Sequence, residues 1–181
     1  MKYYNLKIAG LTRDLPIIKI SDDLSIASFV VLGDCELITA TAKELIKKIP
    51  DVDYFVTAEA KGIPLVHELC RLRKMPYYIV ARKSIKSYMN GAITIDVNSI
   101  TTQSKQILCL DGKDAELIKN KKIALIDDVI STGESLNALE KLVIKSGAEI
   151  ICKAAILAEG DAALRKDIIY LEELPLFSTD K

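Results

Sequence analysis

The chain has little of what metal centres and nucleophilic sites usually require. Its 181 residues include one histidine, no tryptophan and four cysteines. The cysteines lie far apart and form no CxxC pair: Cys35, Cys70, Cys109 and Cys152. A zinc site or a Cys-His nucleophile is therefore not expected, and His67 falls inside a predicted helix rather than in a glycine turn. We expect the four thiols to be reduced and packed as small hydrophobic side chains.

Long hydrophobic runs and net charge are also absent. No uncharged stretch approaches the roughly 18 residues of a membrane span, and the first residues, MKYYNLKIAGLTRDLP, hold no apolar run long enough for a signal peptide. These features predict a cytoplasmic protein without membrane contact. The 25 basic and 25 acidic residues cancel, which argues against a nucleic-acid partner and favours a small ligand.

What the chain does contain is an alternation of short apolar strands and amphipathic helices. Strands are predicted at Tyr54–Ala58, Tyr77–Ala81, Ile123–Ile126 and Ile150–Ala158. A first helix is predicted after Asp34, which could cap it, and would end at Pro50. Two more are predicted over about Pro64–Arg73 and Ser135–Lys145, the last with Gly147 in a C-cap position. This order predicts an α/β fold with a parallel sheet flanked by helices, in which ligands collect at the carboxyl ends of the strands.

We expect one domain with two additions. Residues 34–158 would form the core, and residues 1–33 and 159–181 a small cap, or hood, over the sheet. Residues 84–110 interrupt the alternation: AITIDV and QILCL are two strand candidates separated by SITTQSK. This pattern predicts a flexible hairpin, and long excursions of this kind often act as active-site lids.

The stretch ALIDDVISTGES carries the most specific functional signal. Asp127 and Asp128 follow an apolar run, and a short polar loop leads from them into a helix: Ser131, Thr132, Gly133, Glu134 and Ser135. Backbone N–H groups at a helix start attract an anion, and glycine allows close approach. The two carboxylates would accept hydrogen bonds from sugar hydroxyls or hold Mg²⁺ directly or through water. The alternative is a strand end followed by an ordinary turn that caps a helix.

Two further blocks place cations after predicted strands. TAEAKGIPL turns through Glu59, Ala60, Lys61 and Gly62 into a helix, so charge and helix dipole would both favour an anion there. VARKSIKSY carries Arg82, Lys83 and Lys86 just beyond another strand. An exposed lysine in a turn and a solvated charged turn are the respective alternatives.

In this order the three blocks resemble the type I phosphoribosyltransferases, and the resemblance spans roughly residues 54–157. ALIDDVISTGES is similar to the family's signature for phosphoribosyl pyrophosphate (PRPP), with Glu134 standing where many members have glycine. The turn at Glu59 resembles the family's pyrophosphate-binding turn, which implies a strained or cis Glu59–Ala60 peptide. Ala-Arg-Lys is similar to the adenine and xanthine subgroup, in which the arginine, here Arg82, reaches pyrophosphate across a dimer interface.

The resemblance implies a homodimeric purine phosphoribosyltransferase of purine salvage that uses PRPP and Mg²⁺. Adenine comes first as the acceptor base, with xanthine, hypoxanthine and guanine as alternatives. The implied catalytic residues are Asp127, Asp128, Lys61 and Arg82, the two aspartates also meeting the metal, largely through PRPP and water. The 5′-phosphate would bind residues 131–135, and pyrophosphate would bind Glu59, Ala60, Lys61, Gly62, Arg82, Lys83 and Lys86.

The base and its proton are the least constrained part of the prediction. The purine would stack on Val129, Ile130 or Phe29, although each of these could equally be core, and Glu159 could face the base edge or be a surface residue. Adenine-type members often carry Glu-Tyr in the lid, but residues 99–110 contain no carboxylate. A non-catalytic protein that senses PRPP or a purine is therefore the alternative, although no basic recognition helix precedes the core.

Overall fold

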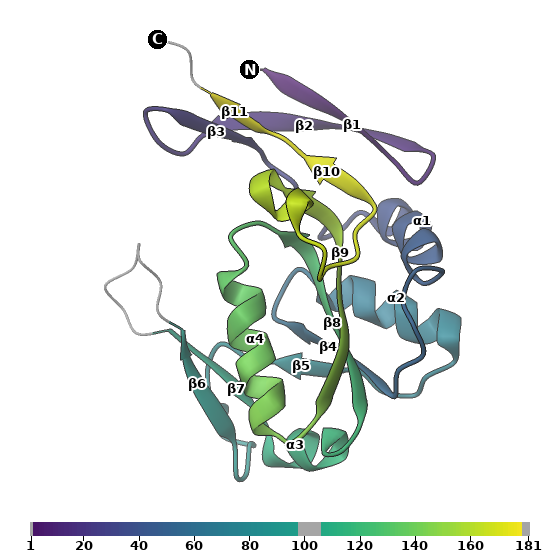
Figure 1. Cartoon of the computed structure of the whole chain (residues 1–181), viewed down its shortest axis with the longest axis vertical. Coiled ribbons are helices and arrows are strands. Elements are labelled where there is room, and N and C mark those ends of the chain that lie inside the picture. The colour runs from purple at the N-terminus through teal and green to yellow at the C-terminus, as the bar shows by residue number, and fades with distance from the viewer. Residues whose placement is uncertain (1, 98–105, 179–181) are drawn as a thin grey trace.

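The computed structural model describes residues 2–97 and 106–178 (Figure 1). At its centre lies a parallel five-stranded sheet in the order β10-β9-β8-β4-β5. The strands are Tyr54–Ala58 (β4), Ile79–Ala81 (β5), Lys122–Ile130 (β8), Glu149–Glu159 (β9) and Glu172–Leu174 (β10). The predicted α/β fold with a parallel sheet is confirmed.

Helices cover both faces of this sheet (Figure 1). They are Cys35–Leu45 (α1), Ile63–Arg73 (α2), Gly112–Ile118 (α3) and Glu134–Lys145 (α4). Ala124 and Ile126 of β8 belong to the hydrophobic layer that contains α1 and α2. Ile123 and Leu125 belong to the opposite layer, with α3 and α4. All four side chains are fully buried, because a strand in the middle of a parallel sheet has no face left for solvent.

Local sequence signals set several helix ends. Asp34 caps α1 by accepting a hydrogen bond from the backbone N–H of Leu37 at 3.0 Å, as predicted. The helix ends at Leu45, five residues before Pro50, the predicted stop. Helix α4 ends just before Gly147, whose φ of +80° is a conformation that glycine adopts without strain. Helix α3 was not predicted.

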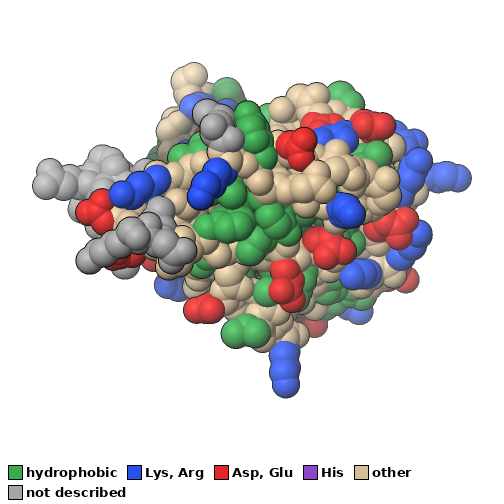
Figure 2. All heavy atoms as spheres, turned by 90° about the horizontal axis from the view of Figure 1, so that it is seen from above, with side chains coloured by type: hydrophobic (Ala, Val, Ile, Leu, Met, Phe, Trp, Pro, Cys, Tyr) green, Lys and Arg blue, Asp and Glu red, His purple; other side chains and the backbone are tan. Residues whose placement is uncertain are grey.

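The two ends of the chain meet in a second sheet, which we call the hood. It is antiparallel with the order β1-β2-β3-β11. Its strands are Tyr3–Ile8 (β1), Leu11–Lys19 (β2), Leu24–Ala27 (β3) and Leu176–Ser178 (β11). The residues after β9 divide between the two sheets: a 3₁₀ turn, Gly160–Leu164 (η1), leads to β10 in the core sheet and then to β11 in the hood. Viewed onto the hood end, acidic and basic side chains are interspersed around a central hydrophobic area (Figure 2).

The hairpin consists of Ile93–Val97 (β6) and Gln106–Leu110 (β7), paired antiparallel as predicted. It lies beside α4 (Figure 1), where the Lys145 ammonium donates to the carbonyl of Thr94 at 3.0 Å. Backbone hydrogen bonds between Arg82 and Cys109, both 2.8 Å, join it to the end of β5. The predicted tip, SITTQSK, and with it Lys105, lies outside the described residues.

The cysteines and the length of the helices bear on two predictions made from the composition. Cys70 and Cys109 are buried, as predicted, whereas Cys35 is exposed and Cys152 is half-buried; all four are free thiols. Within residues 2–97 and 106–178, every helix is too short or too polar to cross a bilayer.

Candidate active site

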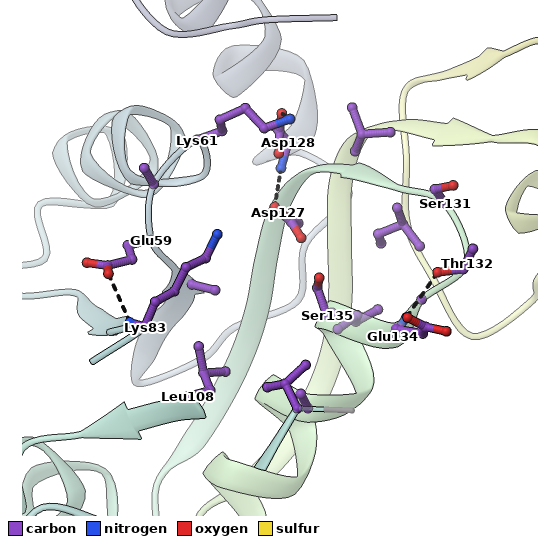
Figure 3. A pocket seen from close by; sticks show the side chains of 18 of the residues that line it. Glu59, Lys61, Lys83, Leu108, Asp127, Asp128, Ser131, Thr132, Glu134 and Ser135 are labelled. Carbon is purple, nitrogen blue, oxygen red and sulfur yellow. Dashed lines mark hydrogen bonds and ion pairs between the residues drawn. The ribbon is translucent and has the colours of Figure 1, made fainter. Parts of the chain in front are cut away.

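A cavity of about 360 Å³ opens at the carboxyl ends of β4 and β8 (Figure 3). Four segments line it: Ala58 at the end of β4 with Glu59, Ala60 and Lys61 after it; Lys83 after β5; Val97, Ile107 and Leu108 of the hairpin; and residues 127–136 with Ala138, from β8 into α4. All three blocks in which the sequence predicts phosphate binding therefore contribute to one cavity. The reason is geometric, because the carboxyl ends of parallel strands share one edge of the sheet.

The acidic pair lies inside β8 rather than beyond its end. The predicted strand stopped at Ile126, but Val129 and Ile130 still pair with β9, so the strand runs four residues further. Successive side chains of a strand point to opposite faces. The two carboxylates consequently occupy different surroundings.

Asp128 holds a buried carboxylate against Lys61. Only 3% of Asp128 is exposed, and its Oδ2 lies 2.9 Å from Nζ of Lys61. This is an ion-pair distance, but its angles do not make a hydrogen bond, so Oδ2 is a buried acceptor without a donor among the described residues. Lys61 balances the charge of this carboxylate, while the hydrogen-bonding capacity of Oδ2 stays open to a donor in the cavity. A hydroxyl of a ligand in the cavity would supply that donor.

The Asp127 carboxyl differs from that of Asp128 in its hydrogen bonding and in its pKa. Its Oδ1 accepts a hydrogen bond from the backbone N–H of Asp128 at 2.9 Å. Burial, together with the negative charge of the Asp128 carboxylate, raises the pKa of Asp127 from 3.8 to about 7. The raised pKa makes Asp127 easier to protonate than an isolated aspartate, and protonation reduces the repulsion that the pair exerts on an anionic ligand. In Figure 3 the Asp127 and Ser135 side chains point toward one another.

The polar loop from Ser131 to Ser135, called the phosphate loop below, ends in the first turn of α4. Gly133 has a φ of +82° and occupies the N-cap position, and no side chain caps the helix there. The N–H groups of Ser135 and Leu136, which have no partner within the helix, are therefore available to an anion in the cavity. Glu134 is exposed, and its backbone N–H donates to Thr132 Oγ1 at 3.5 Å (Figure 3). The carboxylate that departs from the family pattern therefore has access to solvent.

The turn after β4 contains a cis peptide bond between Glu59 and Ala60, the bond that the sequence singled out. Gly62 closes the turn, because a Cβ at this position would collide with Oγ1 of Thr57. The Glu59 carboxylate accepts hydrogen bonds from Arg82 Nε at 2.5 Å and from the backbone N–H of Lys83 at 2.9 Å. This arrangement ties the turn to the end of β5.

Of the three cations after β5, Lys83 lines the cavity, whereas Arg82 and Lys86 do not. Arg82 is held by Glu59 and by the Tyr88 hydroxyl at 3.0 Å, and the Lys86 ammonium donates to Ser84 Oγ at 2.6 Å. Within this chain, Arg82 and Lys86 therefore lie outside the cavity lining, and their place in the predicted pyrophosphate set stays a prediction. Arg82 engages Glu59 because a carboxylate lies within reach on the neighbouring strand end. The contact of Arg82 across a dimer interface stays a prediction.

The candidates for base stacking separate in the same way. Val129 is half-buried and lines the cavity, while Ile130 lines it with only 2% of its surface exposed. Phe29 does not line the cavity: it is 6% exposed and packs in the core between the hood and the sheet, so its assignment as a base contact is corrected. Glu159 lies at the end of β9 and is absent from the lining.

Sequence reasoning missed the apolar wall that the hairpin contributes. Val97, Ile107 and Leu108 face the cavity from the two paired strands. The alternation in AITIDV could have suggested which side chains face inward, but not what they would face. That depends on the contact between the hairpin and β5.

Comparison with known proteins agrees with this geometry. Residues 32–175, most of the chain, match the family model described as the phosphoribosyl transferase domain. The chain belongs to this family. A hypoxanthine/guanine phosphoribosyltransferase of Methanocaldococcus sp. (strain FS406-22) is 36% identical over 138 residues, 75% of this chain and 66% of the relative. One from Methanospirillum hungatei JF-1 is 29% identical over 168 residues, 93% of this chain and 81% of the relative.

Solved structures show the same fold for this phosphoribosyltransferase. The adenine phosphoribosyltransferase of Thermoanaerobacter pseudethanolicus superposes with a TM-score of 0.71 at 20% identity, covering 88% of this chain and 95% of that one. The Giardia lamblia enzyme, complexed with 9-deazaadenine, gives 0.64 at 14% identity, covering 94% and 93%. At these identities the likeness concerns the fold.

Proposed function

We propose that this phosphoribosyltransferase transfers the 5-phosphoribosyl group of PRPP to a nitrogen of a purine base, with release of pyrophosphate. One observation carries the proposal: a single cavity has anion-binding features at both ends and carboxylates between them. Lys61 and Lys83 lie at one end and the phosphate loop at the other, with Asp127 and Asp128 in the middle. PRPP has the complementary order, with pyrophosphate, a ribose diol and a 5′-phosphate.

Each part of the cavity then has a role in the reaction. The phosphate loop would bind the 5′-phosphate through N–H groups and hydroxyls, and the ribose hydroxyls would donate to the acidic pair, supplying the donor that Asp128 Oδ2 lacks. Lys61 and Lys83 would stabilise the charge that develops on pyrophosphate as the bond to C1 breaks. Catalysis would thus rest on positioning and electrostatics.

The donor set also fits Mg²⁺ held mainly by the substrate. Among the described residues no cluster of three or more histidine, cysteine or acidic side chains is placed to hold a metal. Two neighbouring carboxylates, Asp127 and Asp128, together with phosphate oxygens and water, are ligands that Mg²⁺ accepts. When bound, the ion would neutralise charge on pyrophosphate.

For the acceptor base, we put hypoxanthine and guanine before adenine, the reverse of the order favoured by the sequence motifs. The relatives named as hypoxanthine/guanine enzymes are 29–36% identical to this chain, whereas the adenine enzymes of known structure are 14–20% identical. The described part of the hairpin contributes only apolar residues to the cavity lining, so it supplies no carboxylate of the kind that adenine-type members often carry in the lid.

A nucleotide-formation assay tests the proposal. With PRPP and Mg²⁺, hypoxanthine or guanine should give the monophosphate, with adenine and xanthine assayed in parallel. Asp128→Asn should lower kcat/KM by about a hundredfold, because it replaces one carboxylate oxygen that would accept from a ribose hydroxyl with an amide NH2. Asp22→Asn, in the exposed turn before β3, is the matched control. Adenine as the preferred substrate would reverse the order of bases. Binding of PRPP without turnover of any purine would show that the protein senses PRPP rather than catalysing the transfer.

A further inference from the structure

Arg165, which follows η1 and has no assigned role, lies against the phosphate loop. A Cβ added to Gly133 would lie 2.6 Å from Nη1 of Arg165 and 3.9 Å from Cζ. The guanidinium therefore occupies the space that a side chain at Gly133 would need. The φ of +82° favours glycine at this position, and any larger residue would also have to displace the Arg165 guanidinium.

Two parallel hydrogen bonds to one carboxylate, called the fork below, fix the orientation of the Arg165 guanidinium. Its Nε donates to Asp167 Oδ1 at 2.9 Å and its Nη2 to Oδ2 at 2.8 Å. Nη1 is the guanidinium nitrogen left without a hydrogen bond among the described residues, and this nitrogen faces Gly133. A bidentate fork restricts the guanidinium plane far more than a single hydrogen bond would.

The fork is in turn attached to the helix that begins at the phosphate loop. Asp167 Oδ2 lies 3.3 Å from Nζ of Lys153 on β9, and the same Nζ lies 2.8 Å from Oε2 of Glu140 on α4. The Lys153 side chain is 15% exposed, so its contact with Glu140 is better shielded from solvent than its contact with Asp167, whose side chain is 53% exposed. The chain of contacts thus returns to α4, two turns after Gly133.

The charge balance of the loop explains why a cation here matters. Residues 131–135 contain no lysine or arginine and include Glu134, while the acidic pair lies just before them. Lys61 and Lys83 enter the cavity from the other strand ends. Apart from N–H dipoles, a phosphate in this loop would find Arg165 as the cation in contact with the loop itself.

We propose that Arg165 is a positioning residue for the phosphate monoester end of the substrate. It holds the backbone at Gly133 in its binding conformation and turns the Nη1 side of its guanidinium toward the loop, while Asp167 balances the charge on the other side. It is not part of the cavity lining. The inference rests on the proposed function in taking the ligand to be a sugar phosphate.

Steady-state kinetics on three variants test this role. In Arg165→Met, KM for PRPP should rise roughly tenfold while kcat stays within about twofold and KM for the purine is unchanged, because the loss falls on the phosphate end. Arg165→Lys, which keeps the charge but not the fork, should lie between. Arg71→Met is the matched control: Arg71 makes the same fork onto Glu68, with 2.7 Å contacts, on α2 away from the cavity. Thermal unfolding establishes that each variant is folded.

The outcomes separate this inference from the proposed function. A wild-type KM for PRPP in Arg165→Met, or a fall in kcat alone, would overturn the inference and leave the proposed function intact. If the wild type turns over no purine, calorimetric titration with PRPP and ribose 5-phosphate replaces the kinetics. Weaker binding by Arg165→Met than by the wild type then supports the inference without the enzyme, whereas equal binding, or none by the wild type, overturns it.

Discussion

At the scale of single residues, the pairing of charges decides which cations face the cavity. Burial acts to raise the pKa of Glu59, but the backbone N–H of Lys83 and the Arg82 guanidinium outweigh it, and the pKa lies below its usual value. Glu59 therefore stays ionised and holds both neighbours. The backbone of Lys83 is thereby fixed at the cavity edge, while Arg82 is occupied.

A second carboxylate, Asp34, gives a prediction on stability and pH. The Arg13 guanidinium, with the Leu37 N–H, holds the pKa of Asp34 below its usual value, although burial opposes this. A lowered folded-state pKa contributes stability above the unfolded pKa of 3.8, which is lost as pH falls through the folded-state value. Asp34→Ala should lower the free energy of unfolding at pH 7 by about 1–2 kcal/mol, since the cap and the ion pair are both lost.

Denaturant unfolding at pH 7 and pH 3 measures this effect. Asp34→Asn keeps a capping oxygen, so its deficit reports the charge alone and should shrink at pH 3. Glu36→Ala, which removes the exposed second partner of Arg13, serves as the control and should change stability little. An Asp34→Asn deficit that is the same at both pH values would contradict the pKa argument.

At the scale of elements, the turns that follow the strands carry the site, and each depends on a close backbone approach. Gly62, at the start of α2, has no room for a Cβ because Thr57 Oγ1 fills the space. Gly62→Ala should therefore destabilise the protein by about 1–3 kcal/mol through overpacking. The cost should be smaller in a Thr57→Ala background, where the colliding hydroxyl is gone.

A double-mutant cycle by denaturant unfolding tests this coupling. Gly10 is the matched control, because a Cβ there meets nothing within 4 Å, although its φ of +78° still adds strain. Gly10→Ala should therefore show no coupling to Thr57→Ala. If the costs of Gly62→Ala and Thr57→Ala simply add, the turn does not depend on this contact.

At the scale of the whole molecule, the dimer remains a proposal that subunit mixing can test. If Arg82 acts on the partner's cavity, Arg82→Ala and Asp128→Asn protomers that are mixed should form some dimers with one intact site. Activity would then return to about a quarter of the wild type, because random pairing makes half the dimers mixed. If Arg82 acts only through Glu59 of its own chain, each site keeps one defect and activity stays at the level of the separate variants. Size-exclusion chromatography of the same samples reports the assembly directly.

The sequence by itself determined the parallel sheet, the cap of α1, the hairpin strands and the composition of the three site blocks. These follow from local patterns: apolar periodicity, a capping carboxylate, and polar residues that succeed a strand. The phosphate loop and the turn at Glu59 stand out in this way because the function proposed for them depends on consecutive backbone groups.

Tertiary structure alone decided which of those side chains share the cavity. Lys83 rather than Arg82 lines it, because Glu59, 23 residues before Arg82, takes the guanidinium. Phe29 went to the core, since the hood buries it against the sheet. Arg165 meets Gly133 because the turn after β9 returns to the end of β8. Such contacts join residues far apart in the chain, and no local pattern contains them: they exist only once the strands pair and the sheets pack.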